Sequence, residues 1–312
     1  MTSLQKSLAT VLIILSTALA GQAQPLDYKP QILLVTAHPD DDALFSATVF
    51  QTTQLLDGSV DLALMTNGEG GYKYSTLGNY IYNKQLDKEE IGRDQLPGIR
   101  KKELMAGGEI VGLRNYFFFD EKDKEYSLDV EIPFSAWNTD YINTRMQKII
   151  KEGNYDFVFT MMPSPQTHAH HKASAILALR AVQQLEPQNQ PLVLASTIVR
   201  DISDSTGFSG LDGYPITNIN ADVDPFTFDR SQKFGHNNEL DYNMIANWVI
   251  AEHKSQGTMQ QFMGADNAIE QYWYYAFNPA DKASKVRTFF DAVRKAKIYS
   301  DPNGIDENRS RK

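Results

Sequence analysis

The stretch Ile32-Leu33-Leu34-Val35-Thr36, followed directly by Ala37-His38-Pro39-Asp40-Asp41-Asp42, decides the fold class. Its first five residues are mostly branched and apolar, which is typical of a strand buried on both faces of a parallel sheet. The next six include a proline and three aspartates, a composition that favours a loop and the start of a helix. Because ligands of open α/β sheets bind beyond the carboxyl ends of the strands, this loop is a candidate site.

The rest of the chain alternates predicted strands and helices. This βαβ order predicts right-handed crossovers. We therefore expect an α/β fold: a three-layer, Rossmann-like, mostly parallel sheet with helices on both faces. Further strands are predicted over residues 60–66, 116–119, 157–162 and 192–199. Helices are predicted over residues 43–56, 99–113, 137–152, 172–185, 243–263 and 283–296, with a loop over residues 201–220.

Composition narrows the classes of function. The 312 residues include 39 acidic and 30 basic side chains, a net charge of −9, and no cysteine. The acidic balance disfavours a nucleic-acid binder, which needs clustered lysine and arginine. Without cysteine the chain has no disulfide, thiolate zinc site or cysteine nucleophile, so any metal must be held by histidine, aspartate or glutamate.

Residues 1–23 have the pattern of a signal peptide. Lys6 is followed by an apolar run over residues 8–20 and then by small residues. We expect cleavage after Ala23, with Ala20 as the alternative. The apolar run is shorter than the ~20 residues that a bilayer span needs. We therefore expect an exported protein, periplasmic or secreted, with no membrane span in the mature chain.

Residues 24–300 are expected to form one domain, followed by a polar tail over residues 301–312. Within the domain, residues 72–95 are polar and rich in tyrosine, which predicts an insertion at the carboxyl end of the second strand. The tyrosines of this insertion, together with Trp137 and the run Tyr272-Trp273-Tyr274-Tyr275, have two interpretations: they stack on a sugar, or they pack under loops.

A second polar motif, His168-Ala169-His170-His171, follows the predicted fourth strand. His38 and Asp41 are three residues apart, and so are His168 and His171, a spacing that makes side chains neighbours on a helical turn. If the two strand ends meet, they surround one cation with imidazoles and a carboxylate. Because a catalytic zinc ion needs three protein ligands and an open position, we predict a metal site where the two motifs meet.

The loop after the first strand closely resembles the opening motif, Ala-His-Pro-Asp-Asp-Glu, of the LmbE-like (PIG-L) N-acetylglucosaminyl deacetylase family. Further segments resemble motifs of this family in the same order: Thr66-Asn67-Gly68-Glu69, Arg100-Lys101-Lys102-Glu103 with Gly112, residues 119–123, His168 with His171, and His253 with Ser255 and Gln256. Two departures stand out. Asp42 occupies the place of the family's glutamate, and Ala169-His170 replaces its Pro-Asp.

The resemblance implies a role for each matched residue. Three residues are implied as ligands of Zn²⁺: His38, Asp41 and His171. Such ligands also accept Fe²⁺, Mn²⁺ or Co²⁺. Two residues are implied as catalytic, namely Asp40 as the general base and His168 as the group that stabilises the oxyanion or protonates the amine. Three residues are implied in substrate binding: Arg100, Asp123 and Glu69.

We therefore predict an exported zinc-dependent hydrolase that removes the N-acetyl group from an N-acetylglucosamine-type sugar or conjugate. Its partner is a small-molecule or oligosaccharide amino sugar, and no particular oligomeric state is predicted. Two alternatives stay open: a related metal-dependent amidase acting on a sugar conjugate, and a non-catalytic carbohydrate-binding protein. A calcium-stabilised module is disfavoured because Ca²⁺ prefers oxygen ligands to imidazole.

Overall fold

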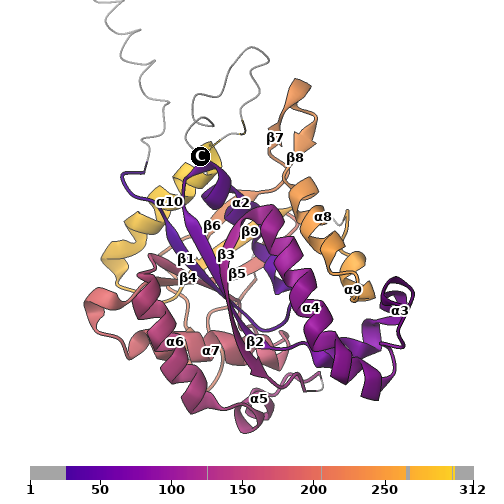
Figure 1. Cartoon of the computed structure of the whole chain (residues 1–312). Helices are drawn as coiled ribbons and strands as arrows, with labels where there is room; N and C mark the ends of the chain where they lie inside the picture. Colours follow the sequence, from indigo (N-terminus) through magenta and orange to yellow (C-terminus); the bar gives the residue numbers. More distant parts are fainter. Residues whose placement is uncertain (1–25, 125, 205, 265–267, 297, 299–312) are drawn as a thin grey trace, which may run out of the picture.

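A central sheet lies between two layers of helices in the computed structural model (Figure 1). The structure describes residues 26–124, 126–204, 206–264, 268–296 and 298. Within these residues, seven strands form one sheet in the order β3-β2-β1-β4-β5-β9-β6. The strands are β1 (Gln31–Thr36), β2 (Ser59–Thr66), β3 (Leu113–Glu121), β4 (Phe157–Met161), β5 (Leu192–Val199), β6 (Phe226–Asp229) and β9 (Ile269–Tyr274).

The strands from β3 to β5 are parallel, whereas β9 pairs antiparallel with β5 and with β6. The helices are α2 (Ser46–Leu55), α3 (Thr76–Tyr82), α4 (Glu89–Val111), α5 (Glu131–Ala136), α6 (Thr139–Gly153), α7 (Ala169–Gln183), α8 (Asn243–Glu252), α9 (Gly257–Gln260) and α10 (Ala283–Lys295). Two short strands, β7 (Lys233–Phe234) and β8 (Leu240–Asp241), form a separate hairpin. The predicted three-layer, mostly parallel α/β fold is confirmed.

The alternation of side chains along β1 builds both layers of the core. Ile32 and Leu34 pack on one face with α2, α4, α8 and α10, and Leu33 and Val35 pack on the other with α6 and α7. These four residues of β1 are at most 1% exposed. Because both faces of the strand are covered, its sequence is a continuous apolar run, as expected for a central parallel strand.

The strand order reverses beside β1. The chain leaves β1 toward β2 on one side, and later returns through β4 on the other side of β1. The loops that follow β1 and β4 therefore leave neighbouring strand ends in the same direction. In doubly wound sheets this reversal point is where ligands bind, and both predicted motifs lie at it.

The predicted helix over residues 99–113 was too short. Helix α4 begins at Glu89, includes Pro97 and ends at Val111, where it is capped by Gly112, which has a left-handed φ of 78°. The segment predicted as a Tyr-rich insertion contains part of a 3₁₀ turn, η2 (Glu69–Tyr74), helix α3 and the first residues of α4. In the first half of α4, Leu96 is fully buried, and the helix continues through Pro97 although proline tends to break helices.

The predicted single helix over residues 243–263 was wrong. Helix α8 ends at Glu252, and a turn separates it from α9. In this turn, the Glu103 carboxylate accepts hydrogen bonds from the backbone N–H of Ser255 (2.7 Å) and from its hydroxyl (2.6 Å). These bonds from a distant helix compensate the backbone groups that the broken helix leaves unpaired.

Strands β6 and β9 were not predicted from the sequence. The run Tyr272–Tyr275 lies in and after β9, where Tyr272, Tyr274 and Tyr275 are fully buried. Trp137 is also buried, and its indole N–H donates to the carbonyl of Lys122 (3.0 Å). The interpretation of these residues as a sugar-stacking platform was therefore wrong, and the packing interpretation was right.

The predicted signal peptide over residues 1–23 and the polar tail over residues 301–312 lie outside the described residues. Among the described residues, no helix combines the length and the apolar character that crossing a bilayer requires.

Candidate metal centre and active site

The loop after β1 is held by backbone contacts that aim Asp41 at the site. Asp41 Oδ2 accepts hydrogen bonds from the backbone N–H groups of Ala37 (2.9 Å) and His38 (2.8 Å). The Thr66 hydroxyl, at the end of β2, donates to the carbonyl of Ala37 (2.7 Å). One carboxylate oxygen thus fixes the turn, while Asp41 Oδ1 points toward the second motif.

The second motif is positioned by a buried lysine at the start of α7. Lys172 Nζ donates to the carbonyls of Leu128 (2.7 Å) and Pro165 (2.9 Å), and the backbone N–H of Ala169 donates to the carbonyl of Ser127 (2.7 Å). These bonds join the loop after β4 to the segment after β3. As a result, the histidines at the beginning of α7 face the loop after β1.

Three predicted ligands converge where the two loops meet. His38 Nδ1 lies 3.0 Å from His171 Nε2, which lies 3.1 Å from Asp41 Oδ1, and His38 Nδ1 lies 3.9 Å from Asp41 Oδ2. Ligand atoms that each bind one zinc ion at about 2.0–2.2 Å are separated by roughly these distances. The donor set of two imidazoles and one carboxylate therefore fits the implied metal.

The protonation states of His38 and Asp41 suit metal binding. Burial lowers the pKa of His38 well below its ordinary value, and the neighbouring His171 and His170 lower it further. Burial alone would raise the pKa of Asp41, but His171, His38 and the backbone hydrogen bond together lower it. A neutral imidazole and an ionised carboxylate are the forms that bind a cation.

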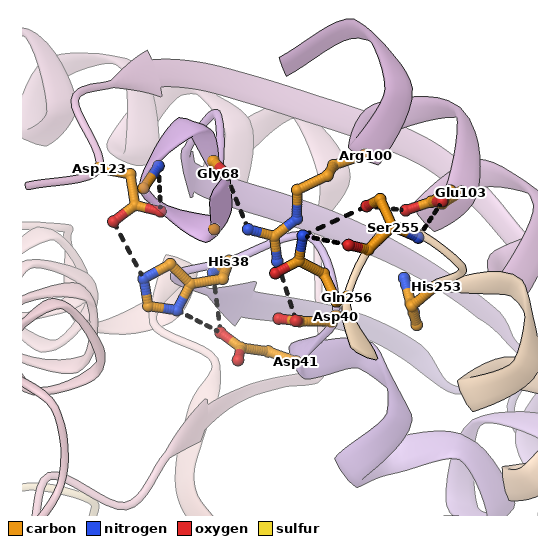
Figure 2. Close-up of polar contacts among 12 residues, drawn as sticks. His38, Asp40, Asp41, Gly68, Arg100, Glu103, Asp123, His253, Ser255 and Gln256 are labelled. Atoms are coloured by element: carbon orange, nitrogen blue, oxygen red, sulfur yellow. Dashed lines mark hydrogen bonds and ion pairs between the residues drawn. The ribbon is translucent and has the colours of Figure 1, made fainter. Parts of the chain in front are cut away.

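Asp40, the predicted base, is held by Arg100. Arg100 Nη2 lies 2.9 Å from Asp40 Oδ2, and Nη1 donates to the carbonyl of Gly68 (2.8 Å), as Figure 2 shows. Burial raises the pKa of Asp40, although the charge of Arg100 opposes this shift. Arg100 was predicted to contact substrate. The structure places two of its nitrogens on Asp40 and Gly68, so it orients the carboxylate.

Asp123 and Glu69 hold each other at the other side of the site. The backbone N–H of Asp123 donates to Glu69 Oε2 (3.1 Å), and the backbone N–H of Gly70 donates to Asp123 Oδ2 (3.2 Å). Asp123 Oδ1 is thereby turned toward His38, 3.9 Å from its Nε2 (Figure 2). Burial raises the pKa of Asp123 to about 7.

Besides the predicted His168 and His171, the second motif also places His170 in the histidine cluster. His170 is 1% exposed, and its Nδ1 lies 3.0 Å from His38 Nε2. Burial lowers the pKa of His170 to about 3. Sequence reasoning treated His170 as a departure from the family pattern without a role, although an imidazole among three others was a signal of a metal environment.

Two aromatic residues pack on the histidine cluster. The ring of Trp137 lies 5.2 Å from that of His170, and the ring of Tyr126 is stacked on His168 at 4.8 Å. Tyr126 is 68% exposed, so its ring covers His168 while remaining open to solvent. Tyr126 was not predicted, because no sequence motif distinguishes it from other surface tyrosines.

Asp42, which stands where the family motif has glutamate, pairs with His253. Asp42 Oδ1 lies 2.9 Å from His253 Nε2, and both side chains are almost fully buried. Burial lowers the pKa of His253, but the carboxylates of Asp42, Asp40 and Glu103 together outweigh this effect and raise it. His253 is therefore a packed, hydrogen-bonded histidine.

An open pocket of about 530 Å³ adjoins the cluster at Asp123. It is lined by Glu69, Arg93, Lys122, Asp123 and Lys124. A wall of charged side chains suits a polar ligand better than an apolar one.

A Rossmann-like sheet with a candidate His/Asp metal site at its reversal point suits a metal-dependent hydrolase. Residues 33–182 match the model of the PIG-L family, described as GlcNAc-PI de-N-acetylase. This match confirms the resemblance drawn from the motifs.

Two curated relatives are similar over about half of the chain. Both are called probable N-acetyl-alpha-D-glucosaminyl L-malate deacetylase 2. The protein from Bacillus cereus is 25% identical over 170 residues, covering 54% of this chain and 69% of its own length. The protein from Bacillus subtilis is 23% identical over 179 residues, covering 57% and 72%.

Solved structures share the fold. The antimicrobial reagent A40926 pseudoaglycone deacetylase superposes with a TM-score of 0.54 at 15% identity, covering 81% of this chain and 100% of that one. A 4-carboxy-2-hydroxymuconate hydratase from Pseudomonas putida superposes with a TM-score of 0.50 at 13% identity, covering 81% and 98%. At these identities the comparison defines the fold alone, since one fold hosts different chemistries.

Proposed function

We propose that this protein is a zinc-dependent N-deacetylase that hydrolyses the acetamide of an N-acetylglucosamine-type sugar or conjugate. The convergence of His38 Nδ1, His171 Nε2 and the Asp41 carboxylate, with separations of 3.0–3.9 Å, carries the proposal. It is supported by the match to the PIG-L family and by the two Bacillus relatives, which are called deacetylases of an N-acetylglucosaminyl compound.

His38, Asp41 and His171 would hold the ion. When bound, zinc supplies Lewis-acid polarisation of the amide carbonyl and acidifies the attacking water. Asp40 then takes the proton from this water as the general base. A base works best when its pKa is near the working pH, and burial moves the pKa of Asp40 in that direction. Arg100 keeps the Asp40 carboxylate in place while the proton is transferred.

Breakdown of the tetrahedral intermediate needs a stabilised oxyanion and a protonated amine. The His168 ring lies beside the ligands, with ring centroids 5.3 Å from His38 and 5.8 Å from His171. From this place it would stabilise the oxyanion, and it or the protonated Asp40 would deliver the proton to nitrogen. The products are acetate and a free amine.

The pocket at Asp123 would receive the sugar. Burial raises the pKa of the Asp123 carboxyl group to about 7, and one of its oxygens is turned toward the histidines. In its ionised form it would accept a hydrogen bond from a sugar hydroxyl group, and in its protonated form it would donate one. Tyr126, stacked on His168 and largely exposed, offers an aromatic face for the ring. Glu69 would act through Asp123, whose backbone it holds.

Export is part of the proposal and rests on the signal-peptide pattern of residues 1–23. The test is N-terminal sequencing of the protein recovered from fractionated cells. A mature N-terminus at Gln24 supports export, whereas an intact Met1 on all of the active protein would argue against it.

Acetate release is the direct test of the activity. The zinc-loaded protein is expected to release acetate from N-acetylglucosamine conjugates, to lose this activity to a chelator and to regain it with zinc. If it hydrolyses other amides of sugar conjugates but no acetamide, the related amidase is the better description. If it binds these sugars and hydrolyses none, the carbohydrate-binding alternative stands.

The first variant to examine is Asp40→Asn. Because asparagine cannot accept the water's proton, we expect turnover to fall by about 10²–10⁴-fold while the zinc content stays at its wild-type value. Asp57→Asn is the matched control, since Asp57 is exposed and has a positive φ of 55°, which asparagine tolerates. Turnover of Asp40→Asn close to that of the control would remove Asp40 from the base role.

A further inference from the structure

The two ring nitrogens of His38 have matching surroundings. On the Nδ1 side lie His171 Nε2 at 3.0 Å and the Asp41 carboxylate at 3.9 Å. On the Nε2 side lie His170 Nδ1 at 3.0 Å and Asp123 Oδ1 at 3.9 Å, and these two atoms are 3.5 Å apart. Each nitrogen therefore faces one imidazole and one carboxylate at distances that suit a shared ion.

A third imidazole, that of His168, lies beside His38 and His170. His38, His168 and His170 each offer a ring nitrogen, and the three atoms lie within 4.8 Å of one another. His170 is 1% exposed, and Trp137 packs against it, so its ring is held in place. The backbone N–H of Gly70 occupies the other oxygen of Asp123 and turns Oδ1 toward the histidines.

We propose that the protein has a second divalent-cation site formed by His38 Nε2, His170 Nδ1, Asp123 Oδ1 and the ring of His168, and that the ion bound there inhibits the enzyme. The inference rests on the proposed first site, which uses His38 Nδ1. Imidazole and carboxylate ligands select a borderline ion such as Zn²⁺ or Co²⁺. With both sites filled, His38 would bind one ion through each ring nitrogen, and its last ring proton would be released to solvent.

Inhibition follows from the residues that the second ion occupies. His168 is the proposed oxyanion and proton-donor group, and Asp123 faces the proposed sugar pocket. An ion held by both removes them from the substrate. The second ion binds more weakly than the first, because it shares a ring with an existing ion of the same charge. Activity is therefore expected to rise with the first equivalent of zinc and to fall with excess.

The test is the zinc stoichiometry of the tag-free protein by equilibrium dialysis, with Co²⁺ absorption titrations beside it. The wild-type protein is expected to bind two ions per chain, with two spectral steps for cobalt. His170→Asn keeps a hydrogen-bond acceptor near Nδ1 but is a poor ligand, so it should bind one. His236→Asn removes an exposed histidine elsewhere and should still bind two.

Inhibition is scored within each variant, as activity in excess zinc divided by activity at one equivalent. The inhibitory midpoint should rise at least about tenfold in His170→Asn and stay unchanged in His236→Asn. One ion per wild-type chain, or inhibition unchanged by His170→Asn, overturns the second site and leaves the proposed function standing. No bound ion in the wild-type protein would instead remove the proposed first site as well.

Discussion

Asp41 shows why aspartate is needed at this position. Its short side chain allows Oδ2 to accept two backbone N–H groups of its own turn while Oδ1 reaches His171, 3.1 Å away. A glutamate at this position would place its carboxylate one methylene further from the turn. One side chain therefore both closes the loop after β1 and supplies a ligand, which links local folding directly to metal binding.

Arg100 is the residue on which the position of Asp40 depends. Its guanidinium binds Asp40 and the carbonyl of Gly68 at the same time, and a lysine ammonium cannot reproduce this forked geometry. We expect Arg100→Lys to lower kcat at least about tenfold, since small misplacements of a catalytic group are costly. Lys102→Gln, which removes an exposed cation from the same helix, should leave kcat within about twofold. A kcat for Arg100→Lys equal to that of Lys102→Gln would show that Arg100 does not orient the base.

At the scale of the element, helix α4 connects the active site to the turn at Ser255, which is distant in the sequence. Arg100 and Glu103 are three residues apart on this helix; Arg100 contacts Asp40, and Glu103 binds Ser255 (Figure 2). The Glu103 carboxylate also accepts a hydrogen bond from the Tyr82 hydroxyl (2.6 Å). The motif that contains Arg100 and Glu103 and the motif that contains His253 and Ser255 therefore contact each other, through Glu103 and Ser255.

The strength of this contact can be measured with Ser255→Ala. The variant loses the hydroxyl bond to a buried carboxylate, and hydrogen bonds to charged groups contribute about 1.5–3 kcal/mol. We expect the free energy of unfolding in urea to fall by this amount. Ser231→Ala, in an exposed turn, should change it by less than about 0.5 kcal/mol. Equal stability of the two variants would show that Glu103 and Ser255 do not anchor the turn.

The elements differ in how far sequence reasoning could predict them. Strands β1 and β5 were predicted within one residue of their bounds, because a central parallel strand is a continuous apolar run with clear ends. Strand β9 was missed, because its pairing with β5 and β6 is antiparallel and joins segments distant in the chain. Its buried Glu270, which accepts the backbone N–H groups of Ala47 and Thr48 at the start of α2, has no local signature either.

The residues of the site also fall into a group that the sequence predicted and a group that it did not. His38, Asp41, Asp40, His168 and His171 were named from two motifs, and the structure brings both motifs together at one point. The partners that orient them depend on tertiary contacts. The contact of Arg100 with Asp40 and that of His170 with His38 could not be predicted from the sequence, because the partners are 60 and 132 residues apart in the chain.

At the scale of the whole molecule, a buried pair joins the first motif to the C-terminal third of the chain. Asp42 and His253 are 211 residues apart in the sequence and lie 2.9 Å apart in the core. Asp42 raises the pKa of His253, so the pair contributes stability in full below the ordinary histidine pKa of about 6.5. That contribution is lost as the pH rises through the raised pKa.

His253→Asn should therefore destabilise the protein more at pH 6 than at pH 9. At pH 6 we expect a loss of about 3–5 kcal/mol, because removing one partner leaves a buried carboxylate uncompensated. The measurement is the difference in unfolding free energy from the wild-type protein at both pH values, with His236→Asn as control. A difference that is the same at both pH values, or larger at pH 9, would show that His253 is not protonated in the fold.

The metal centre is the claim on which the function depends, and it can be located directly. Crystals of the protein grown with one equivalent of zinc should give an anomalous difference peak at the zinc absorption edge. We predict this peak about 2.0–2.2 Å from His38 Nδ1, a carboxylate oxygen of Asp41 and His171 Nε2. A zinc peak elsewhere, with His38 and His171 turned away from each other, would contradict it.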